Sequence, residues 1–224
     1  MKIAYADPPY LGCGVKFYAD HPEAAVYDTV DGHAHLVDRL CDEFPDGWAY
    51  SLTSSSLRLL LPLFPADVRI AAWVKPFHAY KKGVRPAYSW EPVIFRGGRQ
   101  EGPPPAKGGT ANTPKDHVVA NIVLRQGFTG AKPDEFSFWL FSLLGMTRDD
   151  EFVDLFPGSG NVGRAWSKWC RATSLFDEMA MTGEPGAYTR GTDWQPAPVT
   201  PVEVEVPEAM LNIQRAATEV SPQK

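Results

Sequence analysis

The chain has 224 residues, of which 44% are hydrophobic, so it is long enough for one domain of ordinary size with a sizeable core. Its longest apolar stretch, LLLPLF at residues 59–64, contains a proline and falls far short of the roughly 20 residues that cross a bilayer, which excludes a membrane-spanning helix. The three cysteines form no CxxC pattern and the five histidines share no metal-ligand spacing, so we expect no metal site and a reducing, cytoplasmic compartment.

The net charge of −5 argues against a nucleic-acid partner when the chain is taken as a whole, but the charge is distributed unevenly along it. The balance of basic over acidic residues is −5 in residues 1–74, +7 in residues 75–132 and −7 in residues 133–224. Because a local positive patch releases counterions from a phosphate backbone, the middle segment is a candidate nucleic-acid surface, and a solvated basic loop is the alternative. The candidate contact residues are Lys75, Lys81, Lys82, Arg85, Arg96 and Arg99.

The first half of the chain alternates between two kinds of pattern. Strand patterns occupy residues 2–6, 47–54, 67–76 and 90–98, and apolar residues at helical spacing occupy residues 33–44 and 55–64. This order favours an α/β fold, with a mixed, largely parallel sheet and helices on both of its faces.

The second half begins with a stretch rich in glycine, proline and polar residues, 99–130, which predicts a long loop of the kind that is usually functional. A helix is then predicted at 132–146 and a strand at 151–156. A second helix at 160–170 and a strand at 172–176 follow, and a weak helix pattern lies at 207–220 in a proline-rich tail.

The stretch ADPPY ends the first predicted strand with a carboxylate and two prolines. Each proline lacks an N–H and holds φ near about −65°, so the chain after Asp7 must leave the strand as a stiff turn with exposed carbonyl groups. Taken alone, the stretch is typical of a plain strand-ending turn.

The stretch DLFPGSGNVGRAW, residues 154–166, places Asp154 at the end of a strand and three glycines at the start of a helix. Glycines here let the backbone turn sharply and approach a ligand, and Asp177, about 20 residues on, is placed to accept from two ribose hydroxyls. This spacing predicts a nucleoside cofactor, and by itself it also allows an NAD-dependent oxidoreductase. Asp154 suits the ammonium of an amino acid, and no GK[ST] phosphate loop follows.

Together these stretches resemble a known family. ADPPY, GAKPDEFSFWLF and DLFPGSGNVGRAW resemble motifs IV, X and I of the S-adenosylmethionine-dependent DNA amino-methyltransferases, in the circularly permuted order of the beta group. WAYSLTSSS and WEPVIFRGG resemble the strands of motifs VI to VIII. The likeness covers roughly residues 1–178. It implies a Rossmann-like class I methyltransferase fold, with a catalytic part at 1–98, a target-recognition region at 99–130, a cofactor-binding part at 131–178 and a tail at 179–224.

The resemblance implies a role for each motif. The Asp7 carboxylate and the Pro8 carbonyl would accept the two N–H bonds of a target amino group, Pro9 would stiffen the turn, and Tyr10 would stack on the extruded base. Asp177 would hold the ribose of S-adenosylmethionine, and the rest of the cofactor would lie against Lys132, Pro133, Asp154, Phe156, Gly158, Ser159 and Gly160.

The implied reaction is direct in-line transfer of a methyl group to N6 of a flipped adenine in DNA. Transfer to cytosine N4 is an alternative, as is a catalytically weak DNA-binding protein that retains the fold. Whether the substrate is single-stranded DNA or RNA, and whether two chains form a homodimer, stays open. Every version requires the turn at Asp7 and the glycine bend to meet at one edge of one sheet.

Overall fold

The computed structural model describes residues 1–18, 24–77, 82–99, 113–123 and 131–182, and in the last of these ranges it describes side chains up to residue 172. These residues belong to one unit, Met1–Glu184. A second unit, Pro185–Lys224, lies outside the described residues, and so does the helix predicted at 207–220. None of the helices in the described ranges is both long and apolar enough to cross a membrane.

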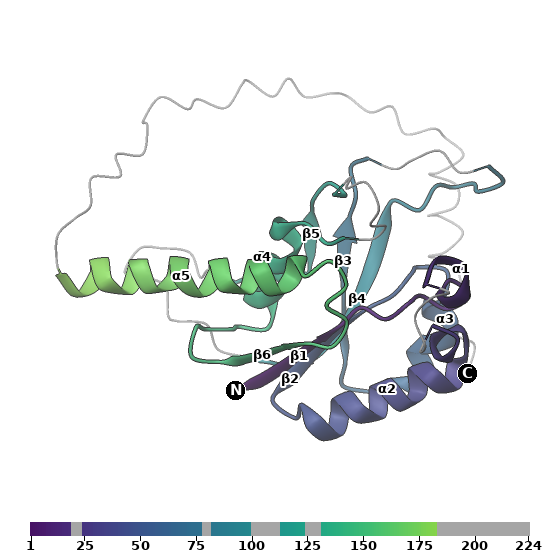
Figure 1. Ribbon diagram of the computed structural model, residues 1–224, viewed down its shortest axis with the longest axis horizontal. Coiled ribbons are helices and arrows are strands. Elements are labelled where there is room, and N and C mark those ends of the chain that lie inside the picture. The colour runs from purple at the N-terminus through teal and green to yellow at the C-terminus, as the bar shows by residue number, and fades with distance from the viewer. Residues whose placement is uncertain (19–23, 78–81, 100–112, 124–130, 183–224) are drawn as a thin grey trace, which may run out of the picture. The chain divides into compact units, whose positions relative to one another are not determined.

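The centre of the fold is a sheet in which six strands are described (Figure 1). Its strand order is β5-β3-β4-β2-β1-β6, and β4 alone runs antiparallel to its neighbours. The predicted α/β fold with a mixed, largely parallel sheet is therefore confirmed. The strands are β1 (Lys2–Ala6), β2 (Gly47–Ser51), β3 (Arg69–Val74), β4 (Trp90–Gly97), β5 (His117–Val119) and β6 (Glu151–Asp154).

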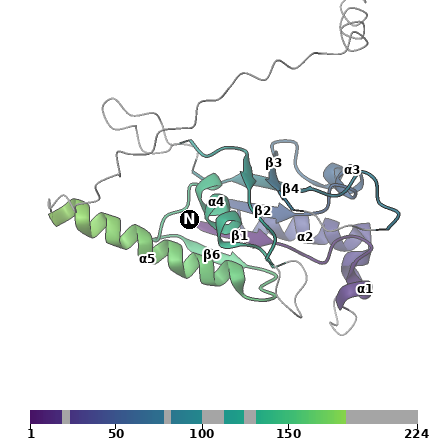
Figure 2. The same ribbon diagram turned by 90° about the horizontal axis from the view of Figure 1, so that it is seen from above.

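Helices cover both faces of the sheet (Figures 1 and 2). One face packs against α2 (Val30–Glu43) and the short α3 (Leu57–Leu60), and the other against α4 (Asp134–Leu143) and α5 (Asn161–Thr182). Helix α2 begins where the Thr29 side chain accepts a hydrogen bond from the Gly32 N–H, a typical N-cap. The remaining helical segments are α1 (Gly14–Tyr18), η1 (Val26–Asp28) and η2 (Leu61–Leu63).

The alternation of side chains along each strand divides the core into two layers. On β1, Ile3 and Tyr5 pack towards α4 and α5, whereas Ala4 and Ala6 pack towards α2. All four are buried almost completely, as are the side chains that the helices place against them. Because each fully buried large apolar side chain contributes about 1.5–3 kcal/mol, this face-by-face burial is what fixes the register of the sheet.

Two elements differ from the sequence prediction. The strand predicted at 172–176 is wrong, because α5 continues without a break to Thr182. An apolar run of five residues fits a helix as well as a strand, and here the helical spacing of the preceding turns continues through it. Strand β5 lies inside the predicted loop, and it forms by pairing in parallel with the edge of β3.

Candidate active site

The candidate site lies where the carboxyl ends of the parallel strands meet at one edge of the sheet, together with the amino end of the antiparallel β4. Asp7 directly follows β1, and Asp154 is the last residue of β6. These two strands pair in parallel, with Tyr5 opposite Asp154. The turn at Asp7 and the glycine bend after β6 therefore lie side by side, which confirms the adjacency that the sequence requires.

A half-buried cluster of charges surrounds Asp7. The ammonium of Lys132 lies 2.9 Å and 2.8 Å from the two carboxylate oxygens of Asp7, 3.1 Å from the Tyr10 hydroxyl and 3.6 Å from Glu91 Oε2. Lys75 forms an ion pair with the other oxygen of Glu91. Only 5% of the surface of Lys132 is exposed, so its charge is held almost entirely by these partners. We call these five residues the charge cluster.

The two carboxylates of the charge cluster differ in how firmly they are ionised. Burial raises the pKa of Asp7, and the nearby Lys132 opposes this rise without cancelling it. Burial also acts to raise the pKa of Glu91, but Lys132 and Lys75 together bring it below its usual value. Glu91 therefore keeps its negative charge, whereas Asp7 is the carboxylate better able to take up a proton.

Tyr10 acts in the cluster as a hydroxyl donor. Burial raises the pKa of its phenol well above the usual value, and the charges of Asp7 and Glu91 raise it further, so Tyr10 keeps its proton. The hydroxyl lies 2.9 Å from Glu91 Oε2 and 3.2 Å from Asp7 Oδ1, and its one proton serves one acceptor at a time. These bonds fix the orientation of the ring, whose predicted stacking on a base stays a prediction.

The indole of Trp73 forms the floor of the charge cluster. Lys75 and Lys132 place their ammonium groups 4.6 Å and 5.6 Å from its ring centre, within the range of cation–π attraction. The indole N–H donates to the Ala120 carbonyl at 2.9 Å, which fixes the ring in place. The cluster thus rests on a rigid aromatic surface between the sheet and α4.

Asp154 has one satisfied and one unsatisfied oxygen. Its Oδ1 accepts a hydrogen bond from the Phe156 N–H at 3.3 Å, whereas its Oδ2 is buried and has no hydrogen-bond partner among the described residues. Burial raises the pKa of Asp154 to about 6, with a further upward contribution from the charge of Asp7. A buried carboxylate oxygen without a donor is costly, so this atom marks a place for a donor or a cation.

The bend after β6 depends on glycine at two positions. Gly158 and Gly160 have φ of +46° and +71°, a region that costs other residues about 1–2 kcal/mol. A Cβ at Gly160 would also lie 3.0 Å from the guanidinium of Arg164. The Gly160 N–H donates to the Pro157 carbonyl, and α5 begins directly afterwards. The bend therefore brings the amino end of a long helix to the same edge as Asp7.

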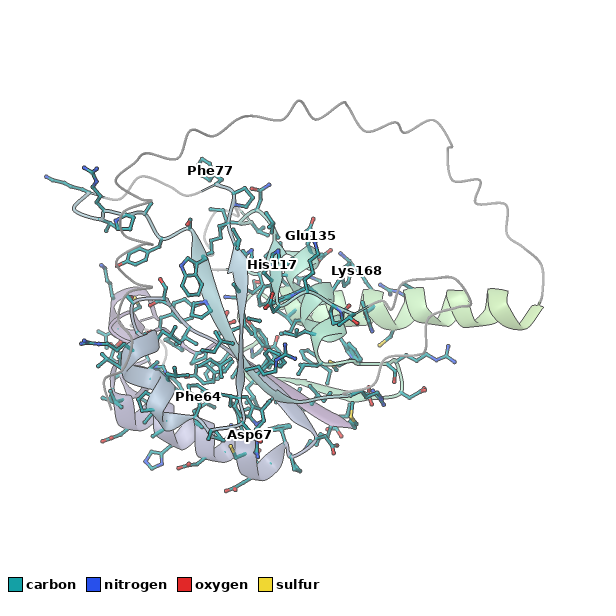
Figure 3. All side chains as sticks on the ribbon, turned by 180° about the vertical axis from the view of Figure 1, so that it is seen from behind. Phe64, Asp67, Phe77, His117, Glu135 and Lys168 are labelled. Atoms are coloured by element: carbon teal, nitrogen blue, oxygen red, sulfur yellow. The ribbon has the colours of Figure 1, made fainter. Side chains whose placement is uncertain are left out.

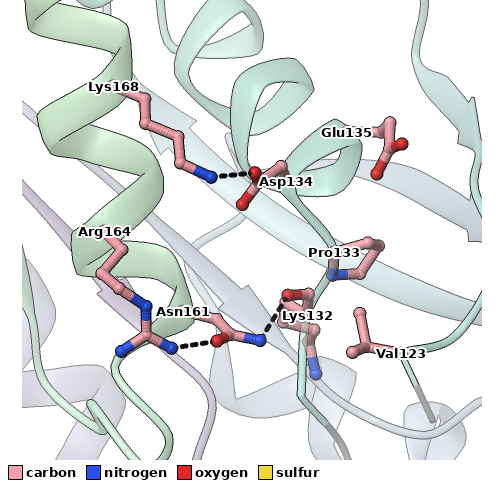
Figure 4. A pocket seen from close by; sticks show the side chains of 8 residues that line it. All are labelled: Val123, Lys132, Pro133, Asp134, Glu135, Asn161, Arg164 and Lys168. Atoms are coloured by element: carbon pink, nitrogen blue, oxygen red, sulfur yellow. Dashed lines mark hydrogen bonds and ion pairs between the residues drawn. The ribbon is translucent and has the colours of Figure 1, made fainter. Parts of the chain in front are cut away.

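A pocket of about 290 Å³ lies between the amino ends of α4 and α5 (Figure 4). Its walls are tied together, because Asn161 donates to the Lys132 carbonyl at 3.3 Å and Lys168 forms an ion pair with Asp134. This volume is at the lower end of the range for small-molecule sites, about 300–1,000 Å³. The lining residues are Val123, Lys132, Pro133, Asp134, Glu135, Asn161, Arg164 and Lys168.

Apart from Asp177, the predicted cofactor residues fall into two groups. Asp154, Phe156 and the bend at 158–160 lie together at the carboxyl edge. Pro133 and Lys132 line the pocket between α4 and α5, and the ammonium of Lys132 binds Asp7; their predicted contact with the cofactor stays a prediction. The sequence therefore predicted Lys132 as a site residue but did not predict the contact between its ammonium and Asp7.

The prediction for Asp177 loses its basis. It depended on a strand ending at residue 176, and the structure has helix α5 there instead. A ribose contact at the end of the next strand requires that strand. The side chain of Asp177 lies outside the described residues.

The predicted nucleic-acid residues lie at two opposite edges of the sheet. Arg96 and Arg99 stand at the carboxyl end of the antiparallel β4, away from Asp7. The Arg96 guanidinium lies 2.9 Å from Asp67, and that of Arg99 lies 2.9 Å from Asp150. Both charges are neutralised by local carboxylates, so the structure does not bring these two residues to the candidate site.

Three of the other basic residues lie on the side of Asp7. Lys75 ends in the charge cluster, and Lys82 and Arg85 are exposed in the connection between β3 and β4. Lys81 lies outside the described residues. Among the described residues of the basic segment, Lys75 is half-buried in the charge cluster, Lys82 and Arg85 are exposed at the same edge, and Arg96 and Arg99 are paired at the far edge.

Sequence reasoning missed Glu91, Trp73 and Asn161. Glu91 lies opposite Trp73 in the antiparallel pairing of β3 and β4, which places it on the α4 side of the sheet. A signal was present, because an acid at the start of one strand and a lysine at the end of the preceding strand meet when the two strands form a hairpin. In the described part of the chain, no group of three His, Cys, Asp or Glu side chains is placed to hold a metal ion.

The comparisons with known proteins concern the fold alone. No protein family and no curated protein matches this sequence. Among solved structures, the complex of M1.HpyAVI with SAM is 13% identical with a TM-score of 0.48, covering 75% of this chain and 78% of that one. The PvuII DNA methyltransferase (cytosine-N4-specific) is 12% identical with a TM-score of 0.46, covering 75% and 72%. Similarity of this extent carries no argument about function, which has to rest on the site.

Proposed function

We propose that this protein transfers a methyl group from S-adenosylmethionine to the N6 amino group of adenine in DNA. The observation that supports this proposal most is that two carboxylates, Asp7 and Asp154, lie at the ends of neighbouring strands and differ in their hydrogen-bond partners. Asp7 follows β1 with its carboxylate bound by Lys132, where it would accept hydrogen bonds from a substrate, and Asp154 has a buried oxygen without a donor among the described residues. A carboxylate that would bind an amino group and a carboxylate that would bind an ammonium thus lie side by side.

The residues present fit the cofactor. The unpartnered oxygen of Asp154 suits the ammonium of the methionine part, and the bend at Gly158 and Gly160 lets a ligand approach the backbone closely. Pro133 and Asn161 would line the adjacent pocket around the remainder. When bound, S-adenosylmethionine would supply a methyl group made electrophilic by its positive sulfur.

Asp7 and Pro8 would prepare the target nitrogen. An exocyclic amino group is a poor nucleophile because its lone pair is delocalised into the ring. Hydrogen bonds from its two N–H groups to the Asp7 carboxylate and the Pro8 carbonyl would hold the nitrogen in the geometry that frees this lone pair. Holding nucleophile and methyl group in line at near-attack distance supplies much of the rate. The raised pKa of Asp7 suits it to receive the proton that the nitrogen loses.

Lys132 must give way for this to happen, since its ammonium occupies the oxygens of Asp7. Glu91 lies 3.6 Å from the same ammonium and offers it a second negative partner. A small movement towards Glu91 would therefore keep Lys132 paired while the target amino group binds Asp7. The exchange would keep Lys132 paired with a carboxylate, and the target amino group would supply the hydrogen bonds that Asp7 loses.

Analysis of nucleosides tests the proposal. DNA incubated with the protein and methyl-labelled S-adenosylmethionine, then digested, is expected to yield label in N6-methyladenine. The tyrosine at position 10 favours adenine, and cytosine carries the same kind of amino group. Label on cytosine N4 would show that the target base is cytosine instead of adenine. DNA binding without label on any base would support the alternative of a catalytically weak DNA-binding protein.

The affinity for the cofactor is expected to depend on the ionisation of Asp154. Its pKa is raised to about 6, and only the ionised form holds an ammonium, so binding should strengthen as pH rises from about 5 to about 7. Below the pKa the change is about tenfold per pH unit. Calorimetric titration with S-adenosylmethionine measures this, and Asp154→Asn should bind more weakly with little pH dependence.

A ligand without the ammonium provides the matched control. Methylthioadenosine keeps the nucleoside and the sulfur but lacks the amino-acid part, so its affinity should not change over the same pH range. An equal pH dependence for both ligands would show that a group other than Asp154 is responsible.

A further inference from the structure

Three large aromatic side chains are exposed near the candidate site. Phe77 is 55% exposed, Tyr88 50% and Trp90 38%. All three belong to the connection between β3 and β4 or to its boundary with β4. Large aromatic rings that gather on one exposed segment generally mark a binding surface.

These rings lie at the same edge as Asp7. The pairing of β3 with β4 continues beyond Val74 and Trp90, because the Lys75 N–H donates to the Ser89 carbonyl at 2.7 Å. Phe77 and Tyr88 therefore follow within two residues of the last paired positions. Figure 3 shows Phe77 at the end of the sheet opposite to Asp67.

The segment also carries exposed positive charge. Lys82 and Arg85 are exposed and form no ion pair with any residue that the structure describes. The acid nearest in the strand pairing, Glu91, is already neutralised by Lys75 and Lys132. In this respect the segment differs from the far edge of the sheet, where Arg96 and Arg99 form ion pairs with carboxylates.

We propose that this segment, formed by Phe77, Lys82, Arg85, Tyr88 and Trp90, binds single-stranded DNA on either side of the target base. Aromatic faces stack on bases, and interspersed cations follow the phosphates. In a duplex the faces of the bases are covered by their own neighbours, so exposed rings find stacking partners in an unpaired strand. This inference rests on the proposed function and adds the class of substrate: single-stranded rather than duplex DNA.

Equilibrium binding without cofactor tests the proposal. A labelled single-stranded DNA, its duplex and an RNA of the same sequence are titrated with the full chain. The single strand is expected to bind at least about tenfold more tightly than the duplex, and Phe77→Ala or Tyr88→Ala should each weaken it by about tenfold. Lys82→Gln and Arg85→Gln should each reduce the slope of log affinity against log salt by about 0.7.

Matched controls come from the opposite edge. Ile70, 43% exposed at the start of the same β3, is the apolar control, and Arg148 is the cationic one. Ile70→Ala and Arg148→Gln should leave binding unchanged. The inference is overturned if the duplex binds as tightly as the single strand, or if Phe77→Ala and Tyr88→Ala leave the affinity unchanged. If the RNA binds more tightly than the single-stranded DNA, the proposal that the surface binds DNA is overturned.

The binding measurement is separate from methyl transfer, so the two proposals fail in different ways. A chain that binds single strands through Tyr88 and transfers no methyl group would refute the proposed function and leave the binding surface standing. A chain that methylates duplex DNA equally well with and without Tyr88 would refute the binding surface alone.

Discussion

Replacement of Asp7 by asparagine is expected to lower kcat for methyl transfer by about 10²–10⁴-fold, the usual contribution of a positioned acid or base. Asparagine keeps the size of the side chain but cannot take up a proton, and its amide offers the ammonium of Lys132 no negative partner. Affinity for the cofactor should be preserved, because in the proposed reaction Asp7 would contact the target and Asp154 the ammonium of the cofactor. Single-turnover kinetics with adenine-containing DNA measures the loss.

The pH profile of the unmodified protein gives a second readout. In the proposed reaction Asp7 acts as a carboxylate, and its raised pKa means that protonation begins at a higher pH than for an ordinary aspartate. The rate should therefore fall as pH falls through this raised pKa, and the residual rate of Asp7→Asn should lack that step. Asp67→Asn, a change at the far edge, is the matched control. Undiminished transfer by Asp7→Asn would refute the assigned role.

Replacement of Lys132 by methionine is expected to lower the free energy of unfolding by about 3–5 kcal/mol near neutral pH. Methionine retains an apolar stem, but the change leaves Asp7 and Glu91 close together without the ammonium that lies between them. Breaking a buried ion pair on one side is costly because the remaining charges cannot regain water. Denaturant unfolding of the variant and the parent protein measures the difference.

The direction in which the stability loss of Lys132→Met changes with pH identifies the cause of that loss. Removing Lys132 removes an interaction that lowers the pKa of Asp7, so the folded variant should bind a proton at a higher pH than the unfolded chain does. The folded state then gains stability as pH falls through that interval, and the loss should shrink towards lower pH. Lys168→Met, which breaks an exposed ion pair with Asp134, should cost less than about 1 kcal/mol. Equal losses for the two lysines would contradict this explanation.

Much of the fold could be predicted because its elements have strong local patterns. The strands at residues 2–6 and 90–98 carry continuous apolar runs, and the carboxyl ends of parallel strands necessarily share an edge, which brought Asp7 and Asp154 together. Short elements that depend on a partner were missed or misread. Strand β5 has three residues and exists through its pairing with β3, and residues 172–176 became helical as the extension of α5.

The parts of the candidate site that could be predicted are those where the residues of a motif determine the local backbone conformation. The proline turn and the glycine bend do so, since proline restricts φ and positive φ requires glycine. The charge cluster is different, because Lys132 and Asp7 are separated by 125 residues and Glu91 meets them only through the sheet register. No local pattern states which of several carboxylates a distant ammonium will bind.

Lys132 bridges the two halves of the site. Its carbonyl accepts a hydrogen bond from Asn161, beside the pocket, while its ammonium binds Asp7. A ligand that shifts the backbone at the pocket therefore also shifts the cation in front of Asp7. If the proposed cofactor changes the affinity for the proposed DNA target by some factor, the DNA must change the affinity for the cofactor by the same factor.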